Sequence, residues 1–451
     1  MNKSNIESTY EEMQVGDAEA EAPQFSPRLE DALARLEAEW DLDGTARESG
    51  ALLRKRGILK AFDLLRIVMG YSVLDLSLRQ LGMWGVILGI SQISKTALLN
   101  RLRKCQVWFG QLVVRALIQQ KLRFPPVHSR VRLKLFDASV ISQPGSRGTD
   151  WRLHLGFDLG RMNMDWIEVT DQHGGEGLQR FSLGPGDLCV ADRGYAVKSS
   201  VGYALAAGAW LLVRVGWLKL PFEDMQGQRW DVITWLKQAQ LIPGGQSKEV
   251  MVWVSTDQGR FALRFLAQAL PEEAAEKARR RLRKQSKNKG KTVDERSLFA
   301  AGFVLLATNL PATDWNMVQI FQWYRFRWQI ELAFKRLKSL LRLDGLRTRD
   351  AQLVQVYLLS KLLAALLLER IQLGLAQQHP EAFSAQDRPL SYWRLTELLW
   401  DELRSVVRGQ VTLQKIFAVF PSLLRFLSDE PRRRISQRSQ AQSILSGLCG
   451  C

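Results

Sequence analysis

The chain of 451 residues is 46% hydrophobic and 24% charged, which excludes a disordered protein and leaves room for two to four domains with buried cores. Its formal net charge is +17. Residues 1–50 hold thirteen acidic and four basic side chains, so the remaining 401 residues carry about +26. This asymmetry predicts a polyanionic partner for the body of the protein, with nucleic acid the leading candidate and an anionic membrane surface the alternative.

The spacing of the cysteines and the longest apolar run indicate in which cellular compartment the protein is located. The cysteines match neither a disulfide framework nor a zinc motif; they are Cys105, Cys189, Cys449 and Cys451. The acidic N-terminus has no basic segment followed by an apolar core, which argues against a signal peptide. The longest apolar run, residues 353–371, contains Lys361, Glu369 and Arg370, so it predicts a buried helix rather than a membrane span. We therefore expect a cytoplasmic protein without a membrane partner.

The N-terminal quarter is predicted to be helical after an acidic flexible tail at residues 1–26. Residues 27–125 follow the helical period and are expected to form a DNA-binding domain. Within them, two short helices separated by a break at Gly89–Ser91, the second capped by Ser94, fit a helix-turn-helix. The basic side chains of the second helix are Lys95, Arg101, Arg103 and Lys104. The alternative is a packing domain whose basic residues are only surface.

Beyond two prolines at positions 125 and 126 the period changes to that of strands. Short strands are predicted in VRLKLFDAS, DWRLHLGFDLG, MNMDWIEVTD and DLCVADRGY, followed by a helix in VKSSVGYALAAGA and a strand in WLLVRV. Strands in a meander, then alternating with helices, indicate an α/β core. Residues 126–215 are its first part, and residues 301–345, with the strand FVLLATNLP and a helix, are its second part.

Residues 216–300 read as a β-rich insertion between the two parts of the core. A hairpin is predicted around Asp257-Gln258-Gly259. Nine of the fifteen residues from Lys277 to Lys291 are Lys or Arg, so this run is expected to add phosphate contacts, with a solvated loop as the alternative. Residues 346–451 are again helical and leucine-rich, and we expect them to pair two protomers.

Two aspartates close short apolar strands, Asp137 in LKLFDAS and Asp192 in LCVADRG. Glu331, from a helix docked on the sheet, could supply a third carboxylate. Three such groups repel one another unless cations neutralise them, and Mg²⁺ or Mn²⁺ suits oxygen ligands. Two ions about 4 Å apart can promote phosphoryl transfer. Aspartates also form turns, and spacing alone does not exclude Asp158, Asp165 and Asp171 as ligands.

The stretch YRFRWQIELAFKRLK predicts a helix with one polar stripe. At 100° per residue, its polar side chains fall within an arc of about 60°; they are Tyr324, Arg327, Glu331 and Lys338, with Lys335 beside them. The opposite face is apolar and suited to docking, and consists of Phe326, Ile330, Ala333, Leu337 and Leu340. From the pattern alone, the stripe is either solvated surface or one wall of a site.

These spacings resemble one known family. Tyr324, Arg327, Glu331 and Lys338, separated by two, three and six residues, match the Tyr-Arg-Glu-Lys signature of the insertion-sequence-four family of DDE transposases. The other blocks follow in order: FDAS, ADRGY, LVRV and LLATNLP. The resemblance covers roughly residues 70–370. The first block reads Asp-Ala-Ser where many members have Asp-Gly-Ser or Asp-Ser-Thr, which leaves Asp137 in place.

The resemblance implies an α/β fold with an RNase-H-like mixed-sheet catalytic core, interrupted after its fifth strand by the β-rich insertion, and helical terminal domains. It also implies that Asp137, Asp192 and Glu331 form a metal triad that binds two Mg²⁺ or Mn²⁺ ions. A second set of basic and aromatic side chains would bind the DNA phosphates. That second set comprises Tyr324, Arg327, Lys338, Arg193 and Lys335. The four histidines, His128, His154, His173 and His379, lack ligand spacing, which argues against a histidine-based nuclease.

The implied activity is cut-and-paste transposition in the bacterial nucleoid. The enzyme would bind double-stranded terminal repeats as a homodimer, cleave them and join the 3′-hydroxyls to target DNA. The alternatives are an RNase-H-like nuclease without strand transfer and a catalytically silent DNA-binding derivative. Relatives that cleave through a DNA hairpin stack a tryptophan on an extruded base; Phe303 occupies that position here, and Trp328 matches the second aromatic.

Overall fold

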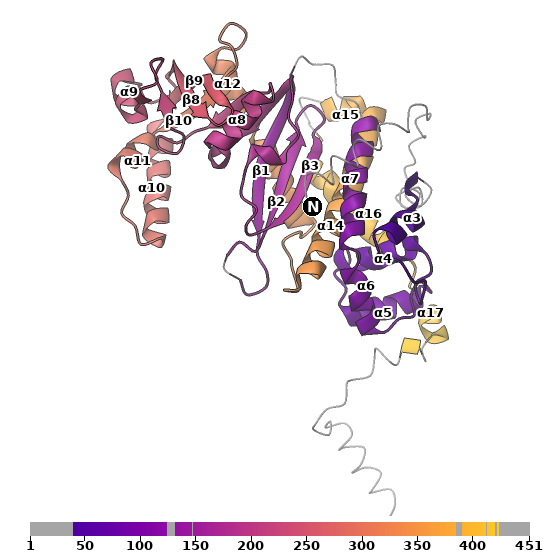
Figure 1. Cartoon of the computed structure of the whole chain (residues 1–451). Coiled ribbons are helices and arrows are strands. Elements are labelled where there is room, and N and C mark those ends of the chain that lie inside the picture. Colours follow the sequence, from indigo (N-terminus) through magenta and orange to yellow (C-terminus); the bar gives the residue numbers. More distant parts are fainter. Residues whose placement is uncertain are drawn as a thin grey trace, which may run out of the picture. The chain divides into compact units, whose positions relative to one another are not determined.

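The computed structural model describes residues 39–123, 131–146, 148–384, 390–411, 413–419 and 422–423 (Figure 1). The predicted acidic tail, His128, Cys449 and Cys451 lie outside these residues. The chain divides into two compact units, the first within residues 110–349 and 362–397 and the second within residues 26–109, 350–361 and 398–451.

The first unit contains a mixed sheet of ten strands in the order β3-β2-β1-β4-β5-β10-β9-β8-β6-β7. Its first five strands are β1 (Arg132–Ile141), β2 (Trp151–Asp158), β3 (Asn163–Asp171), β4 (Asp187–Ala191) and β5 (Trp210–Arg214). β1 pairs antiparallel with β2 and parallel with β4, and β4 pairs parallel with β5. This is the RNase-H-like order, and the predicted mixed α/β fold is confirmed.

The burial of these strands explains their sequences. β4 lies between β1 and β5, and all five of its residues are buried, which is why it reads as a continuous apolar run. The predicted helix that follows is α8 (Lys198–Ala206), which returns the chain to β5. The core beneath the sheet includes Phe136, Cys189, Leu211, Val213, Phe265 and Leu305.

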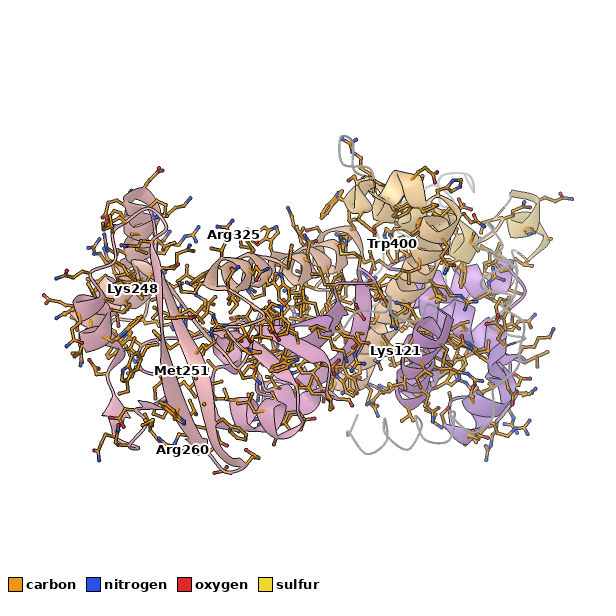
Figure 2. All side chains as sticks on the ribbon, turned by 90° about the horizontal axis from the view of Figure 1, so that it is seen from above. Lys121, Lys248, Met251, Arg260, Arg325 and Trp400 are labelled. Carbon is orange, nitrogen blue, oxygen red and sulfur yellow. The ribbon has the colours of Figure 1, made fainter. Side chains whose placement is uncertain are left out.

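The insertion continues the same sheet instead of forming a separate one. β10 (Phe303–Thr308) pairs antiparallel with both β5 and β9 (Gly259–Ala269), and β9 pairs with β8 (Ser247–Thr256) in the predicted hairpin. Figure 2 shows Lys248, Met251 and Arg260 spaced along this hairpin. The sheet ends with β6 (Phe222–Glu223) and β7 (Arg229–Trp230).

Three helices complete the insertion, namely α9 (Val232–Ala239), α10 (Glu272–Asn288) and α11 (Glu295–Ala300), gathered around β8–β10 in Figure 1. The basic run from Lys277 lies mainly on α10, so most of it is a helix and not the loop of the alternative, and its contact with phosphates stays a prediction. The helix carries only one buried residue, Ala275, and therefore presents most of its charges to solvent.

The predicted helix of the polar stripe is not continuous. It consists of α12 (Met317–Arg325), α13 (Trp328–Lys335) and a π-helical turn at Arg336–Leu340. Between α12 and α13 the backbone amides of Phe326 and Arg327 donate to the carbonyls three residues earlier, which is the tighter 3₁₀ pattern. Phe326, expected on the docked face, is 43% exposed, because this turn rotates it out of that face.

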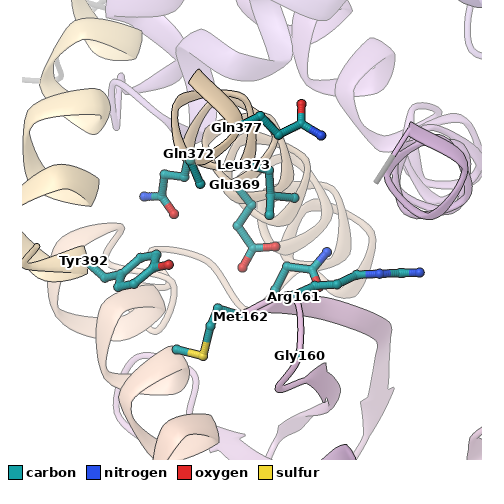
Figure 3. A pocket seen from close by; sticks show the side chains of 10 residues that line it. Gly160, Arg161, Met162, Glu369, Gln372, Leu373, Gln377 and Tyr392 are labelled. Carbon is teal, nitrogen blue, oxygen red and sulfur yellow. The ribbon is translucent and has the colours of Figure 1, made fainter. Parts of the chain in front are cut away.

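Two long helices flank β3 in the first unit. Glu369 of α14 (Ala351–Gln378) accepts hydrogen bonds from Met164 N at 3.0 Å and from Gln120 Nε2 of α7 (Gln106–Arg123) at 3.3 Å. A cavity of about 250 Å³ lies beside this carboxylate (Figure 3). Met162, Gln372 and Tyr392 also line it, the last from the start of α16 (Tyr392–Arg408).

The second unit is helical, as predicted. It contains α3 (Leu42–Glu48), α4 (Ala61–Ser72), α5 (Leu78–Ile87), α6 (Lys95–Arg103) and α17 (Leu413–Ala418), with the adjoining parts of α7, α14 and α16. Ser94 caps α6 by accepting from Ala97 N at 3.2 Å, so the predicted second helix and its cap are confirmed. α15 (Pro380–Ser384) belongs to the first unit.

Helix α14 is long and apolar enough to cross a membrane by composition, yet 78% of its most apolar stretch is buried inside the structure. Its fully buried Lys361 has its ammonium 3.6 Å from Asp75 and 4.5 Å from the ring centre of Tyr357. A buried charge matched in this way is typical of a core helix. The interrupted apolar run is therefore a buried helix, as predicted.

Candidate active site

Strand pairing brings Asp137 and Asp192 together. β1 and β4 run parallel, and the last pair in register is Phe136 and Ala191. The next residues are the two aspartates, which therefore lie side by side where this pairing ends. Asp192 closes β4 as predicted, whereas Asp137 lies within β1, which continues to Ile141 because β2 still pairs with it.

The Asp137 carboxyl group has an environment that disfavours its charge. The pKa of Asp137 is raised to about 6: burial and the negative charges of Asp192 and Glu176 raise it, whereas the hydrogen bond from Ala138 N and the nearby Arg327 lower it. Ala138 N donates to Asp137 Oδ1 at 2.8 Å. Like charges gathered at a partly buried point are the condition that a bound cation would relieve.

Arg327 connects the helical segment to this pair. Its Nη1 lies 3.5 Å from Asp137 Oδ2, and its Nη2 donates to Glu331 one turn further along α13. α13 packs against β1, which places Glu331 on the same side as Asp137. The arginine thus occupies the space between two of the three predicted carboxylates.

Among the described residues, the buried Tyr324 hydroxyl has no hydrogen-bond partner of normal geometry, although the Arg327 side chain is close enough to affect its pKa. Burial raises its pKa, the positive charges of Arg327 and Arg214 lower it, and the negative charge of Asp192 raises it. The Arg327 guanidinium is 6.0 Å from the centre of its ring. An unsatisfied buried hydroxyl amid arginines fits the recognition of an anion.

Arg193 and Lys338 lie on two other sides of the site. Arg193 follows Asp192 directly, and the charges of Arg214, Asp192 and Tyr324 act on its guanidinium. Lys338 Nζ donates to the Val140 carbonyl near the end of β1 at 2.8 Å. Tyr324, Arg327 and Glu331 therefore form one cluster, whereas the ammonium of Lys338, on the π-helical turn, contacts the end of β1.

Three further predicted site residues have distinct surroundings. Lys335 lies 5.4 Å from the ring centre of Trp393. Trp328 is 57% exposed at the start of α13. Phe303, at the start of β10, packs against the core and has its ring 5.3 Å from that of Phe299. Trp328 is the more accessible of the two aromatics.

Glu176 is a site residue that sequence reasoning missed. It lies between β3 and β4 in the segment GGEGLQR. Burial raises its pKa, as does the charge of Asp192, whereas Arg152 and Lys219 lower it. Its nearest sequence signal is the pair of glycines before it, which indicates a turn and no chemistry.

The aspartates that spacing could not exclude have structural roles. Asp158 accepts from Arg161 N at 3.2 Å in the turn after β2, and Asp171 accepts from His173 N at 2.9 Å. Asp165 pairs with Lys121 at 3.0 Å and Lys134 at 3.4 Å. None of the three takes part in the cluster around Asp137.

The described histidines also lie apart from this cluster. His154 is buried, with Nε2 3.0 Å from Thr170 Oγ1, and burial lowers its pKa to about 3. His173 contacts Gln172, and His379 Nδ1 lies 3.6 Å from Glu381.

Among the described residues, no three acidic, cysteine or histidine side chains are arranged as a ready metal cage. At this site, the Arg327 guanidinium lies between Asp137 and Glu331. The donor set nevertheless fits a hard divalent cation, because it consists of carboxylate oxygens that repel one another. Asp137, Asp192 and Glu331 are the residues that would hold it.

Comparisons with known proteins agree with this chemistry. A family described as "Transposase DDE domain" matches residues 135–367. The putative transposase InsL for insertion sequence element IS186A of Escherichia coli (strain K12) is 36% identical over 345 residues, covering 75% of this chain and 92% of that protein. The transposase for IS421 of Escherichia coli is 36% identical over 346 residues, with the same coverage of both chains.

More distant proteins carry the same kind of name. The transposase for IS231F of Bacillus thuringiensis subsp. israelensis is 25% identical over 281 residues, covering 58% of this chain and 57% of that protein. Among solved structures, a cryo-EM structure of the piggyBac transposase synaptic complex with hairpin DNA has a TM-score of 0.42 and 11% identity, covering 89% of this chain and 85% of that one.

Proposed function

The chain belongs to the family of transposases with a DDE domain, and from this premise we propose that it is a cut-and-paste transposase of an insertion sequence. DNA binding and the use of a divalent cation follow from the family. The proposal adds that the enzyme recognises the double-stranded terminal inverted repeats of its own element. It cleaves these ends and joins their 3′-hydroxyls to target DNA.

The observation that supports the proposal is that Asp137 and Asp192 lie side by side where β1 and β4 stop pairing, and that Arg327 contacts both Asp137 and Glu331. Two aspartates follow the last register pair of β1 and β4, and α13 brings the glutamate against β1. Bound Mg²⁺ or Mn²⁺, two ions per site, would activate the attacking hydroxyl and stabilise the leaving oxygen. The protein holds the carboxylates rigid through strand pairing and through the hydrogen bond from Ala138 N.

The cationic side chains around the triad are assigned to the DNA backbone. Tyr324 is within electrostatic range of Arg327, Arg193 and Arg214, and its hydroxyl has no hydrogen-bond partner of normal geometry within the described chain. A phosphate of the scissile strand would accept hydrogen bonds from this group of donors. Lys338 and Lys335 extend the positive surface along the same segment.

Two further surfaces are proposed to contact the rest of the DNA. On α10, the side chains of Lys277, Arg281 and Lys284 fall within an arc of about 60° and are exposed. The α5–α6 helix pair is the proposed sequence-reading element. Two of its basic residues have internal partners, because Arg101 donates to the carbonyls of Ala51 and Arg54 and Arg103 pairs with Asp350 at 2.6 Å.

Cleavage through a hairpin and pairing of two protomers complete the proposal. Trp328, exposed beside Arg327, is the proposed stacking residue for an extruded base. Phe303 is a weaker candidate, since its ring packs on Phe299. The C-terminal helices are proposed to pair protomers, and α16 exposes Leu398 at 67%, an apolar side chain suited to an interface.

The test is incubation of the protein with DNA carrying the ends of its element and Mg²⁺, scoring nicks, double-strand breaks and joined products. Joined products support transposition. Cleavage without joining would instead favour the RNase-H-like nuclease, and binding without cleavage would favour the silent DNA-binding derivative.

A further inference from the structure

Glu176 approaches Asp192 across the glycine of the ADRGY block. An ideal Cβ placed on Gly194 would lie 2.0 Å from Glu176 Oε2 and 2.9 Å from Asp192 Oδ1. Both distances are measured from the same Cβ position, so Glu176 Oε2 and Asp192 Oδ1 lie at most about 5 Å apart. Only glycine permits this approach, since a methyl group would occupy the space where Glu176 lies.

The Asp192 carboxylate is oriented toward the same glycine. Gly194 N donates to Asp192 Oδ1 at 2.6 Å. On the other side of this turn, Lys219 Nζ donates to the carbonyls of Arg193 at 3.3 Å and Gly194 at 2.8 Å. The turn is thereby held in the conformation that keeps the two carboxylates adjacent.

Glu176 itself has no direct partner within the described chain. No hydrogen bond or ion pair of its carboxylate is formed there, although the charges of Arg152 and Lys219 act on it from a distance. Glu168, in contrast, is paired by Arg180 at 3.0 Å. A part-buried carboxylate beside a second carboxylate is costly unless a cation joins them.

An independent observation comes from Tyr195, which is fully buried and whose hydroxyl has no hydrogen-bond partner within the part of the chain that the structure describes. Burial raises its pKa, and the charges of Asp137, Glu176 and Asp192 raise it further. The hydroxyl is therefore under the combined influence of the three carboxylates. An orphaned buried hydroxyl at this place points to a group absent from the protein itself.

We propose that Glu176 is a fourth carboxylate of the active site, which helps Asp137 and Asp192 to bind a divalent cation on the side of Asp192 that faces the β3–β4 connection. This inference rests on the proposed function. Glu331 approaches from α13, and Glu176 approaches from the segment before β4, so that the cation-binding region extends beyond the triad.

The experiment measures Mn²⁺ binding to the full-length protein by calorimetry without DNA, together with the Mg²⁺ concentration that gives half-maximal cleavage of end DNA. Glu176→Gln should weaken Mn²⁺ binding about 10-fold or more, the range found when groups supporting a metal site are removed. It should also raise the Mg²⁺ requirement, with cleavage partly recovered at high Mg²⁺. Asp171→Asn, the corresponding change at an exposed carboxylate at the end of β3, should leave both unchanged.

Glu176→Asp keeps the charge and should bind Mn²⁺ more tightly than Glu176→Gln, which separates a cation-binding role from a loss of folding. Wild-type Mn²⁺ affinity and wild-type Mg²⁺ dependence in Glu176→Gln would overturn the inference. If Asp137→Asn still abolishes cleavage in that case, the proposed function stands without it. A wild-type protein that neither binds Mn²⁺ nor cleaves would overturn both.

Discussion

Arg327 Nη1 lies 3.5 Å from Asp137 Oδ2, so a side chain of the helical segment reaches a carboxylate in a strand of the sheet. The same guanidinium pairs with Glu331. The positive charge of Arg327 therefore neutralises two carboxylates that are proposed to bind metal ions. Arg327 has two tasks in this view: it stabilises the acidic pair before ions arrive, and it binds a phosphate oxygen afterwards.

Replacing Arg327 by Gln should lower cleavage of end DNA by about 10²-fold or more, since this removes a positive charge aimed at the reacting phosphate. Mn²⁺ binding without DNA should not weaken, because the variant removes a competing cation. Arg325→Gln, an exposed arginine on α12 (Figure 2), is the matched control. Equal losses of cleavage in the two variants would show that only the total positive charge of the protein affects cleavage, and not the position of Arg327.

Asp137→Asn, Asp192→Asn and Glu331→Gln should each abolish nicking while binding of end DNA persists. Each change removes a carboxylate and leaves the cationic side chains in place. Gel-based cleavage and binding assays on the same substrate measure the two effects, with Asp171→Asn as the control. A variant that nicks at the wild-type rate in Mg²⁺ would remove its residue from the triad.

The triple variant Lys277→Gln, Arg281→Gln and Lys284→Gln should weaken binding to all DNA sequences alike and flatten the dependence of log K on log salt. Removing one ionic interaction with a DNA phosphate reduces this slope by about 0.9. The double variant Arg279→Gln and Arg283→Gln should have a smaller effect, because these two arginines are already paired with Glu272 and Glu276. An unchanged slope in the triple variant would exclude α10 from the interface.

Trp328→Ala should preserve first-strand nicking and reduce hairpin product, since stacking on an extruded base contributes about 1–3 kcal/mol. Phe303→Ala should instead lower the melting temperature, because its ring packs against Phe299 and the core. Denaturing gels and thermal unfolding separate the two outcomes. Loss of nicking and hairpin in parallel for Trp328→Ala, or no hairpin from the wild type, would contradict the stacking role.

Glu369 predicts a pH dependence of stability that is unrelated to the active site. Burial raises its pKa from 4.5 to about 7, against the hydrogen bonds from Met164 N and Gln120 and the nearby Arg336. Between pH 4.5 and about 7, Glu369 is therefore protonated in the folded state and ionised in the unfolded state. Stability should fall as pH rises from 4.5 to 7, by about 1.4 kcal/mol per unit of pKa shift.

Chemical unfolding of the wild type and of Glu369→Gln over pH 4 to 8 measures this effect. The variant should lose the downward slope, because glutamine stays neutral and can still accept from Met164 N. An identical pH profile in both proteins would show that Glu369 is ionised in the folded state throughout.

Local sequence patterns were sufficient for the order of elements and the helix cap at Ser94, and they made Asp137 and Asp192 candidate ligands; the family resemblance was needed to prefer these two and Glu331 over Asp158, Asp165 and Asp171. Each depends on neighbours within a few residues or on the spacing of a short motif. The alternation of side chains predicts a strand, and an apolar run such as that of β4 predicts a buried one. The mixed α/β class then follows from the order of strands and helices.

Tertiary structure alone decided which distant residues share a site. Glu176 lies in a glycine-rich turn without periodicity, and it reaches Asp192 only because β3 and β4 are placed in the same sheet. The insertion joins that sheet through β10, which lies between β5 and β9; no local pattern encodes this, because the partners of a strand are chosen by long-range pairing. The internal partners of Arg101 and Arg103 are likewise set by the tertiary structure, because the carbonyls of Ala51 and Arg54 and the carboxylate of Asp350 are distant in the sequence.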